Sequence, residues 1–196
     1  MDNPESSIFR FSELTPRPWP NGRGVTRDVA NKKSGNGSHD WLISIAELVE
    51  DAEFSHYEGC NRILTLVREN SIDLHISELS PLRCNPLVPV HFPGDRPTRC
   101  TMVGGPSRAF NVVINRERMM GAVSSVFMSS NHETKVPHSP VAIHCVAGTL
   151  MVQGEVLRSG DTLVAPRDHS LQTHETSATL LVVNVQERSG GVASCR

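Results

Sequence analysis

Two arginines in this sequence stand directly beside apolar, strand-like segments. Arg27 lies in an alternating segment after a loop rich in Pro, Asn and Gly, and Arg62 immediately precedes the apolar run 63–67. A guanidinium buried without an anion is costly, so each arginine needs a partner. The partner is either an internal acid or the carboxylate of a ligand, which a planar guanidinium can hold through two parallel hydrogen bonds. Three residues are candidates for the internal acid: Glu47, Asp28 and Asp51.

Five other residues could complete a small binding site with these arginines. Asn111 lies in an apolar segment, and its amide can both donate and accept hydrogen bonds. Trp19, Trp41 and Phe54 are candidate apolar walls, because only 5% of the chain is aromatic and these rings lie close to the arginines in the sequence. His75, within a strand-like segment, is a candidate contact if it faces inward. Filling of the core is the alternative role for the three rings and for the histidine.

The sequence offers no recognisable metal centre or catalytic triad. A first-row metal needs three or four imidazoles or carboxylates that converge on one point, yet the nine histidines include no His-x-His pair followed by Glu. Ser55 and His56 are adjacent, which on a strand turns their side chains to opposite faces. No Gly-x-Ser-x-Gly elbow occurs. We therefore predict no catalytic residue, no metal and no cofactor.

The composition argues against some classes of protein. The chain has 19 basic and 21 acidic residues, so it lacks the basic excess typical of nucleic-acid binding. No apolar run approaches the roughly 18 residues that span a membrane, and the N-terminus does not resemble a signal peptide. Five cysteines without a Cys-x-x-Cys spacing favour a reducing compartment. We expect a cytoplasmic protein without nucleic-acid or membrane partners.

Short strand-like segments dominate the chain. Thirteen prolines and fourteen glycines divide it into pieces too short for long helices, which indicates a β-sandwich or barrel. The alternation at Trp41, Ile43 and Ile45 predicts one buried face. The predicted strands are 41–48, 62–67, 71–76, 109–114, 121–129, 141–146, 149–152, 162–165 and 179–186.

A weak internal repeat suggests two related halves. The hairpin-like pair 64–76 is echoed by 144–166, which includes a predicted tight hairpin at Gln153 and Gly154. The segment 115–120 is the best link between the halves. This predicts an N-terminal half over 1–115 and a C-terminal half over 116–196.

Several motifs resemble the HutD/Ves family of the cupin superfamily, which is linked to bacterial histidine breakdown. They are PWPNGRGVTRD over 18–28, WLISIA over 41–46, the pair FS at 54–55 and GCNR over 59–62. Asn111 also resembles a family segment, with Val113 where Met is common. The resemblance implies a bicupin, in which two jelly-roll β-barrel halves pack as one unit.

The resemblance also implies a function. It suggests a cytosolic small-molecule binding protein that holds a carboxylate intermediate of histidine degradation, of the formylglutamate or urocanate class, and acts as a sensor or modulator of histidine utilisation. We expect Arg27 and Arg62 to face one pocket in the N-terminal half, with Asn111, Phe54 and Trp19 around it. The alternative is a cofactor-free or metal-dependent cupin enzyme that acts on the same acids. A homodimer is a candidate assembly.

Overall fold

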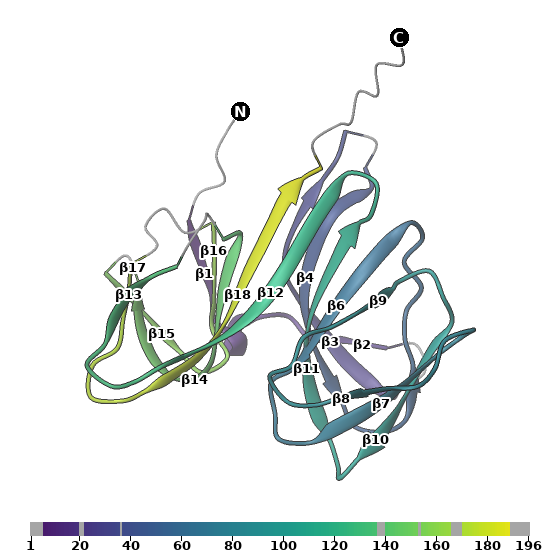
Figure 1. Cartoon of the computed structure of the whole chain (residues 1–196), viewed down its shortest axis with the longest axis horizontal. Helices are drawn as coiled ribbons and strands as arrows, with labels where there is room; N and C mark the ends of the chain where they lie inside the picture. The colour runs from purple at the N-terminus through teal and green to yellow at the C-terminus, as the bar shows by residue number, and fades with distance from the viewer. Residues whose placement is uncertain are drawn as a thin grey trace.

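The computed structural model describes residues 6–19, 22–35, 37–136, 140–152, 154–165 and 170–188. These residues form strands and one short 3-10 turn, which confirms the all-β prediction. The strands gather in two lobes, with the N-terminal lobe at the right of Figure 1 and the C-terminal lobe at the left. Pro20 and Asn21 of the predicted loop and Gln153 of the predicted hairpin lie outside the described residues.

Two facing sheets form the N-terminal lobe. The six-stranded sheet has the order β2-β3-β4-β11-β6-β9. Its strands are β2 (Arg17–Pro18), β3 (Gly24–Lys33), β4 (His39–Leu48), β11 (Ser107–Asn115), β6 (Cys60–Leu66) and β9 (Val90–Pro93). The four-stranded sheet consists, in order, of β5 (Ala52–Glu53), β10 (Thr98–Val103), β7 (Ser71–Ile76) and β8 (Leu82–Cys84). Apolar side chains from both sheets meet in one buried cluster.

The six-stranded sheet is buried on both faces. On β4, Ala46 and Leu48 face the four-stranded sheet, while Trp41, Ile43 and Ile45 face the C-terminal lobe. The predicted buried face of this strand is therefore confirmed. The opposite face is buried as well, which explains why 41–48 contains so few polar residues, as expected for a strand covered on both sides.

One long strand organises the C-terminal lobe. The beginning of β14 (Ala142–Val152) pairs with β16 (Thr162–Val164) and β18 (Ala178–Glu187). Its end pairs with β15 (Glu155–Arg158) and β17 (Ser170–Gln172), after a register shift between Cys145 and Ala147. Such a shift bends a strand, so β14 belongs to both layers of this lobe. The remaining strands at its margins are β12 (Met119–Met128) and β13 (Glu133–Lys135).

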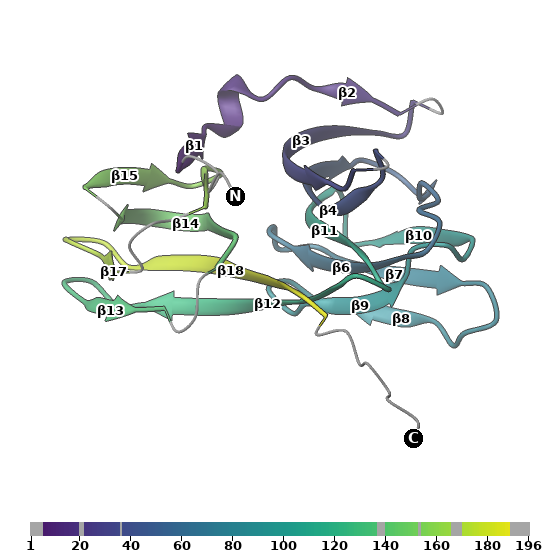
Figure 2. The same ribbon diagram turned by 90° about the horizontal axis from the view of Figure 1, so that it is seen from above.

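The beginning of the described chain crosses between the lobes. Strand β1 (Ser7–Phe9) pairs with β16 in the C-terminal lobe, and the turn η1 (Phe11–Glu13) then leads to β2 in the N-terminal lobe. Figure 2 shows this crossing along one edge of the molecule. The division into halves at residues 115 and 116 stays a prediction.

The sheets of the described residues are open and do not close into barrels. The strand predicted over 71–76 has those bounds, whereas β9 and β10 were not predicted as strands. The proline-rich segment 80–89 contributes only the edge strand β8 to a sheet, in agreement with the poor fit of proline to central strands. No helix in the described part of the chain has the length and apolar character needed to cross a membrane.

Candidate functional site

The candidate site is centred on Arg62, whose side chain lies inside the N-terminal lobe. Its backbone in β6 lies between Val113 of β11 and Phe92 of β9. The residue is 7% exposed, although it carries one of the most strongly hydrated types of side chain. Gly94 makes room for it, because a Cβ at this glycine would lie 3.2 Å from Cγ of Arg62 and 3.3 Å from Cβ of Tyr57.

Neutral oxygens provide the hydrogen bonds of the Arg62 guanidinium. Nη2 donates to Oδ1 of Asn111 over 3.1 Å, and Nη1 donates to the carbonyl oxygen of Ser55 over 3.4 Å. Nε is buried and has no hydrogen-bond partner in the described part of the chain. Among the described residues, no carboxylate forms an ion pair with this guanidinium. Arg62 therefore retains donor capacity that the described protein groups do not use.

Three aromatic rings surround the same guanidinium. Its Cζ lies 4.8 Å from the ring centre of Phe54, 5.1 Å from that of Phe92 and 5.5 Å from that of Tyr57. Ring faces attract cations and so offset part of the cost of desolvation. Burial nevertheless lowers the pKa of Arg62 to about 10. The group remains a cation at neutral pH, held in an apolar shell.

Trp19 stands behind this aromatic shell. Its ring meets Phe54 edge-on at 6.2 Å between ring centres, and its indole Nε1 donates to Oγ1 of Thr26 over 2.7 Å. Gly24 permits this packing, because a Cβ there would come within 2.9 Å of the indole. Trp19 therefore supports the ring that covers Arg62.

Arg27 lies on the other face of the six-stranded sheet. It pairs with Ile45, which faces the C-terminal lobe, whereas Arg62 lies on the face of Leu64 and the four-stranded sheet. The structure does not bring Arg27 and Arg62 together, so the expectation of one shared pocket is not met. The reason is the parity of the strands, since neighbouring positions alternate between the two faces.

Arg27 pairs with an internal acid, which is one of the two kinds of partner that its sequence context allowed. Its Nη1 donates to Oε2 of Glu47, and Nη2 of Arg108 donates to Oε1 of the same carboxylate over 3.0 Å. Both guanidiniums also lie over the ring of Phe11, with Cζ at 4.7 Å for Arg27 and 4.0 Å for Arg108. Burial alone would raise the pKa of Glu47, but the two arginines outweigh it and lower that pKa.

His75 points to the outer surface of the four-stranded sheet. It is exposed, and its Nε2 lies 3.1 Å from Oγ1 of Thr101. It lines an open surface cavity of about 520 Å³ together with Phe54, His56 and Arg99. Phe54 is thus shared between this cavity and the shell around Arg62, while His75 lies on the cavity side only.

Sequence reasoning missed Tyr57, Phe92 and the carbonyl oxygen of Ser55 as neighbours of Arg62. Phe92 belongs to the segment 92–95, in which Gly94 and Asp95 resemble the glycine-acid turn of cupins. This resemblance was the sequence signal that could have indicated Phe92. The described residues contain no group of three His, Cys, Asp or Glu side chains placed to hold a metal ion. The absence of a cofactor stays a prediction.

The layered all-β fold is cupin-like. A cupin 2 conserved barrel domain protein from Leptotrichia buccalis superposes with a TM-score of 0.59 at 11% identity, over 92% of this chain and 96% of that one. HutD from Pseudomonas fluorescens SBW25 superposes with a TM-score of 0.76 at 24% identity, over 94% of this chain and all of that one. These similarities establish the fold.

The family follows from the sequence match. The family model described as HutD matches residues 11–182, so the chain belongs to the HutD family. A relative from Pseudomonas putida, described as an uncharacterized 21.2 kDa protein in the hutC 3' region, is 31% identical over 116 residues. That alignment spans 57% of this chain and 59% of the relative.

Proposed function

We propose that this chain is a binding protein for a small carboxylate, which it holds against Arg62. The observation behind the proposal is a buried guanidinium that has neutral oxygens and aromatic rings around it and no acidic partner among the described residues. A buried cation of this kind gains most from a hydrogen-bonded anion. A ligand carboxylate would supply one.

The chemistry of the surrounding groups supports an organic acid. A guanidinium binds a carboxylate bidentately, and the unsatisfied Nε of Arg62 is one of the donors that such a ligand could use. Phe54, Phe92 and Tyr57 offer apolar surface for the body of the ligand. Phe54 also lines the surface cavity of about 520 Å³, which makes this ring the candidate gate between solvent and Arg62.

The family and the description of the Pseudomonas putida relative suggest the class of ligand. We propose a carboxylate intermediate of histidine degradation, of the formylglutamate or urocanate class, and a role as sensor or modulator of histidine utilisation. The proposal includes a cytoplasmic location and a bicupin organisation in which jelly-roll halves over 1–115 and 116–196 pack as one unit.

Calorimetric titration with formylglutamate and urocanate tests the proposal. The variant Arg62→Lys keeps the charge and loses the planar fork. A charge-assisted hydrogen bond contributes about 1.5–3 kcal/mol, so affinity should fall roughly ten- to a hundredfold. Arg83→Lys is the matched control, because Arg83 pairs with Asp73 on the exposed side of the same lobe.

Thermal melts of the same variants separate a binding role from a structural one. If Arg62 serves a ligand, the Arg62→Lys protein should melt close to the wild type without ligand and gain less stability when ligand is added. A folded Arg62→Lys variant that binds both acids as tightly as the wild type would remove Arg62 from the site.

A further inference from the structure

A second cavity lies between the two lobes, away from Arg62. Its volume is about 210 Å³. The turn η1 lies beside it and is visible as the purple coil between the lobes in Figure 1. Both lobes and this turn contribute lining residues: Phe11, Ile45, Val67, Arg68, Arg108, His144, Val146, Ser159 and Gly160.

The charged side chains that line this cavity are both cations. Arg108 lines it from β11, and Arg68 lines it from the loop after β6. None of the described lining residues is acidic. Arg68 is exposed, and within the described part of the chain it forms no ion pair or hydrogen bond through its side chain. The cavity therefore presents an excess of positive charge.

Arg108 is only partly neutralised. It shares the carboxylate of Glu47 with Arg27, so two cations share one anion. Its Nε is buried, and no described residue accepts a hydrogen bond from it. A buried donor without an acceptor costs free energy, and an acceptor that enters the cavity would relieve that cost.

His144 lies in the cavity wall and is a candidate third donor. Its Nδ1 lies 2.9 Å from Oγ1 of Thr162, and its ring stacks on Phe110 at 4.7 Å between ring centres. Burial, reinforced by the charge of Arg108, lowers the pKa of His144 to about 3, which keeps the ring neutral. The Thr162 hydroxyl can donate to Nδ1, and the ring proton then resides on Nε2.

We propose that this cavity between the lobes is a second ligand site, which binds a small monocarboxylate. Arg108 and Arg68 hold the carboxylate, Nε2 of His144 donates to it, and its short apolar part lies against Phe11 and Val146. The ligand must be small, because sites for drug-sized molecules measure about 300–1,000 Å³ and this cavity measures about 210 Å³.

A ligand in this cavity would contact both lobes, unlike a ligand at Arg62. Ile45 and Arg108 belong to the N-terminal lobe, whereas His144, Ser159 and Gly160 belong to the C-terminal lobe. A ligand that binds residues of both lobes stabilises their packing against each other by mass action. The Arg62 site faces the opposite side of the six-stranded sheet, so the two sites are separate.

The test is a titration of the full chain with acetate and propionate, followed by amide resonances in two-dimensional nuclear magnetic resonance spectra. Saturable shifts should appear at Val146, Ser159 and Gly160, and they should persist in an Arg62→Met variant. Arg68→Ala should weaken binding about tenfold or more, through loss of a charge-assisted hydrogen bond. Because Arg68 is exposed, this variant should fold normally.

Arg158→Ala is the matched control. It removes the same charge from an exposed position of β15, close to the cavity in sequence but not among its lining residues. Binding by this variant should equal that of the wild type. Absence of saturable shifts at the cavity, equal weakening by both alanine variants, or saturation by inorganic phosphate and not by either carboxylate would overturn the proposal.

Discussion

Nη2 of Arg62 lies 3.1 Å from Oδ1 of Asn111, so the partner of this buried cation is a neutral amide. The two residues come from the neighbouring strands β6 and β11 and share the face that meets the four-stranded sheet. A carboxylate at position 111 would neutralise the guanidinium internally. Among the described residues no carboxylate compensates the charge of Arg62, and under our proposal an anionic ligand takes that place.

The variant Asn111→Asp tests this relationship directly. The new carboxylate should pair with Arg62 and compete with a ligand for the same donors, so affinity for formylglutamate or urocanate should fall about tenfold or more. Calorimetric titration measures this loss. Asn31→Asp is a control at an exposed position of β3 in the same lobe and should bind like the wild type. An Asn111→Asp protein with unchanged affinity would contradict a ligand site at Arg62.

Glu47→Gln should destabilise the fold, because it leaves Arg27 and Arg108 without their shared anion. Glu47 is about one-third exposed, so solvent screening limits the loss to about 1–3 kcal/mol. Urea unfolding at neutral pH measures it. Glu155→Gln, which changes an exposed acid on β15, should have little effect. Equal stability of the two variants would show that the carboxylate of Glu47 is dispensable.

The carboxylate of Glu47 should also make part of the free energy of unfolding sensitive to acid. The pKa of Glu47 is lower in the folded chain than its ordinary value of 4.5. Its contribution is therefore complete above the unfolded value and is lost as the pH falls through the folded value. The difference in unfolding free energy between the wild type and Glu47→Gln should shrink below about pH 4.5.

His144 should make the free energy of unfolding depend on pH over a higher pH range than Glu47 does. Its pKa is about 3 in the folded chain, against 6.5 as the ordinary value. Below pH 6.5 the unfolded chain binds a proton that the folded chain does not, so stability falls as the pH drops toward 3. His144→Gln should have a flatter profile than the wild type between pH 6.5 and 4.5 in urea unfolding. Parallel profiles would mean that the imidazole is solvated.

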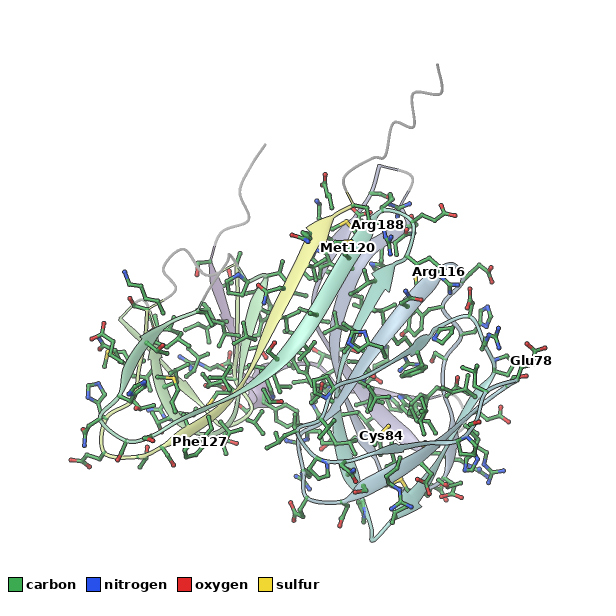
Figure 3. All side chains as sticks on the ribbon, in the orientation of Figure 1. Glu78, Cys84, Arg116, Met120, Phe127 and Arg188 are labelled. Atoms are coloured by element: carbon green, nitrogen blue, oxygen red, sulfur yellow. The ribbon has the colours of Figure 1, made fainter. Side chains whose placement is uncertain are left out.

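Trp41→Ala should be strongly destabilising. The indole is 8% exposed and packs in the cluster between the lobes, and loss of a buried aromatic ring costs about 3–5 kcal/mol. Phe127→Ala is the control, because this ring is 70% exposed on β12 and is labelled at the surface in Figure 3. Thermal melts should show a large fall for the first variant and little change for the second. Similar melting temperatures would place the indole outside the core.

Local sequence patterns determined much of the strand structure and the family. The alternation at Trp41, Ile43 and Ile45 predicted a strand with a buried face, and the motifs over 18–28 and 59–62 indicated the HutD/Ves family. Such signals are local, since side chains alternate between faces at every residue of a strand. The strand β9, which supplies Phe92, was not predicted, because prolines at positions 89 and 93 flank its other three residues and proline fits poorly into strands.

The tertiary structure decided which charges have partners. Arg27 and Arg62 look alike in sequence, each beside an apolar segment, yet one pairs with Glu47 and the other lies among Phe54, Tyr57 and Phe92. The outcome depends on which strands pair and in what register, because a shift of one residue moves a side chain to the opposite face. Pairing between strands distant in the sequence sets that register, and no single segment contains the information.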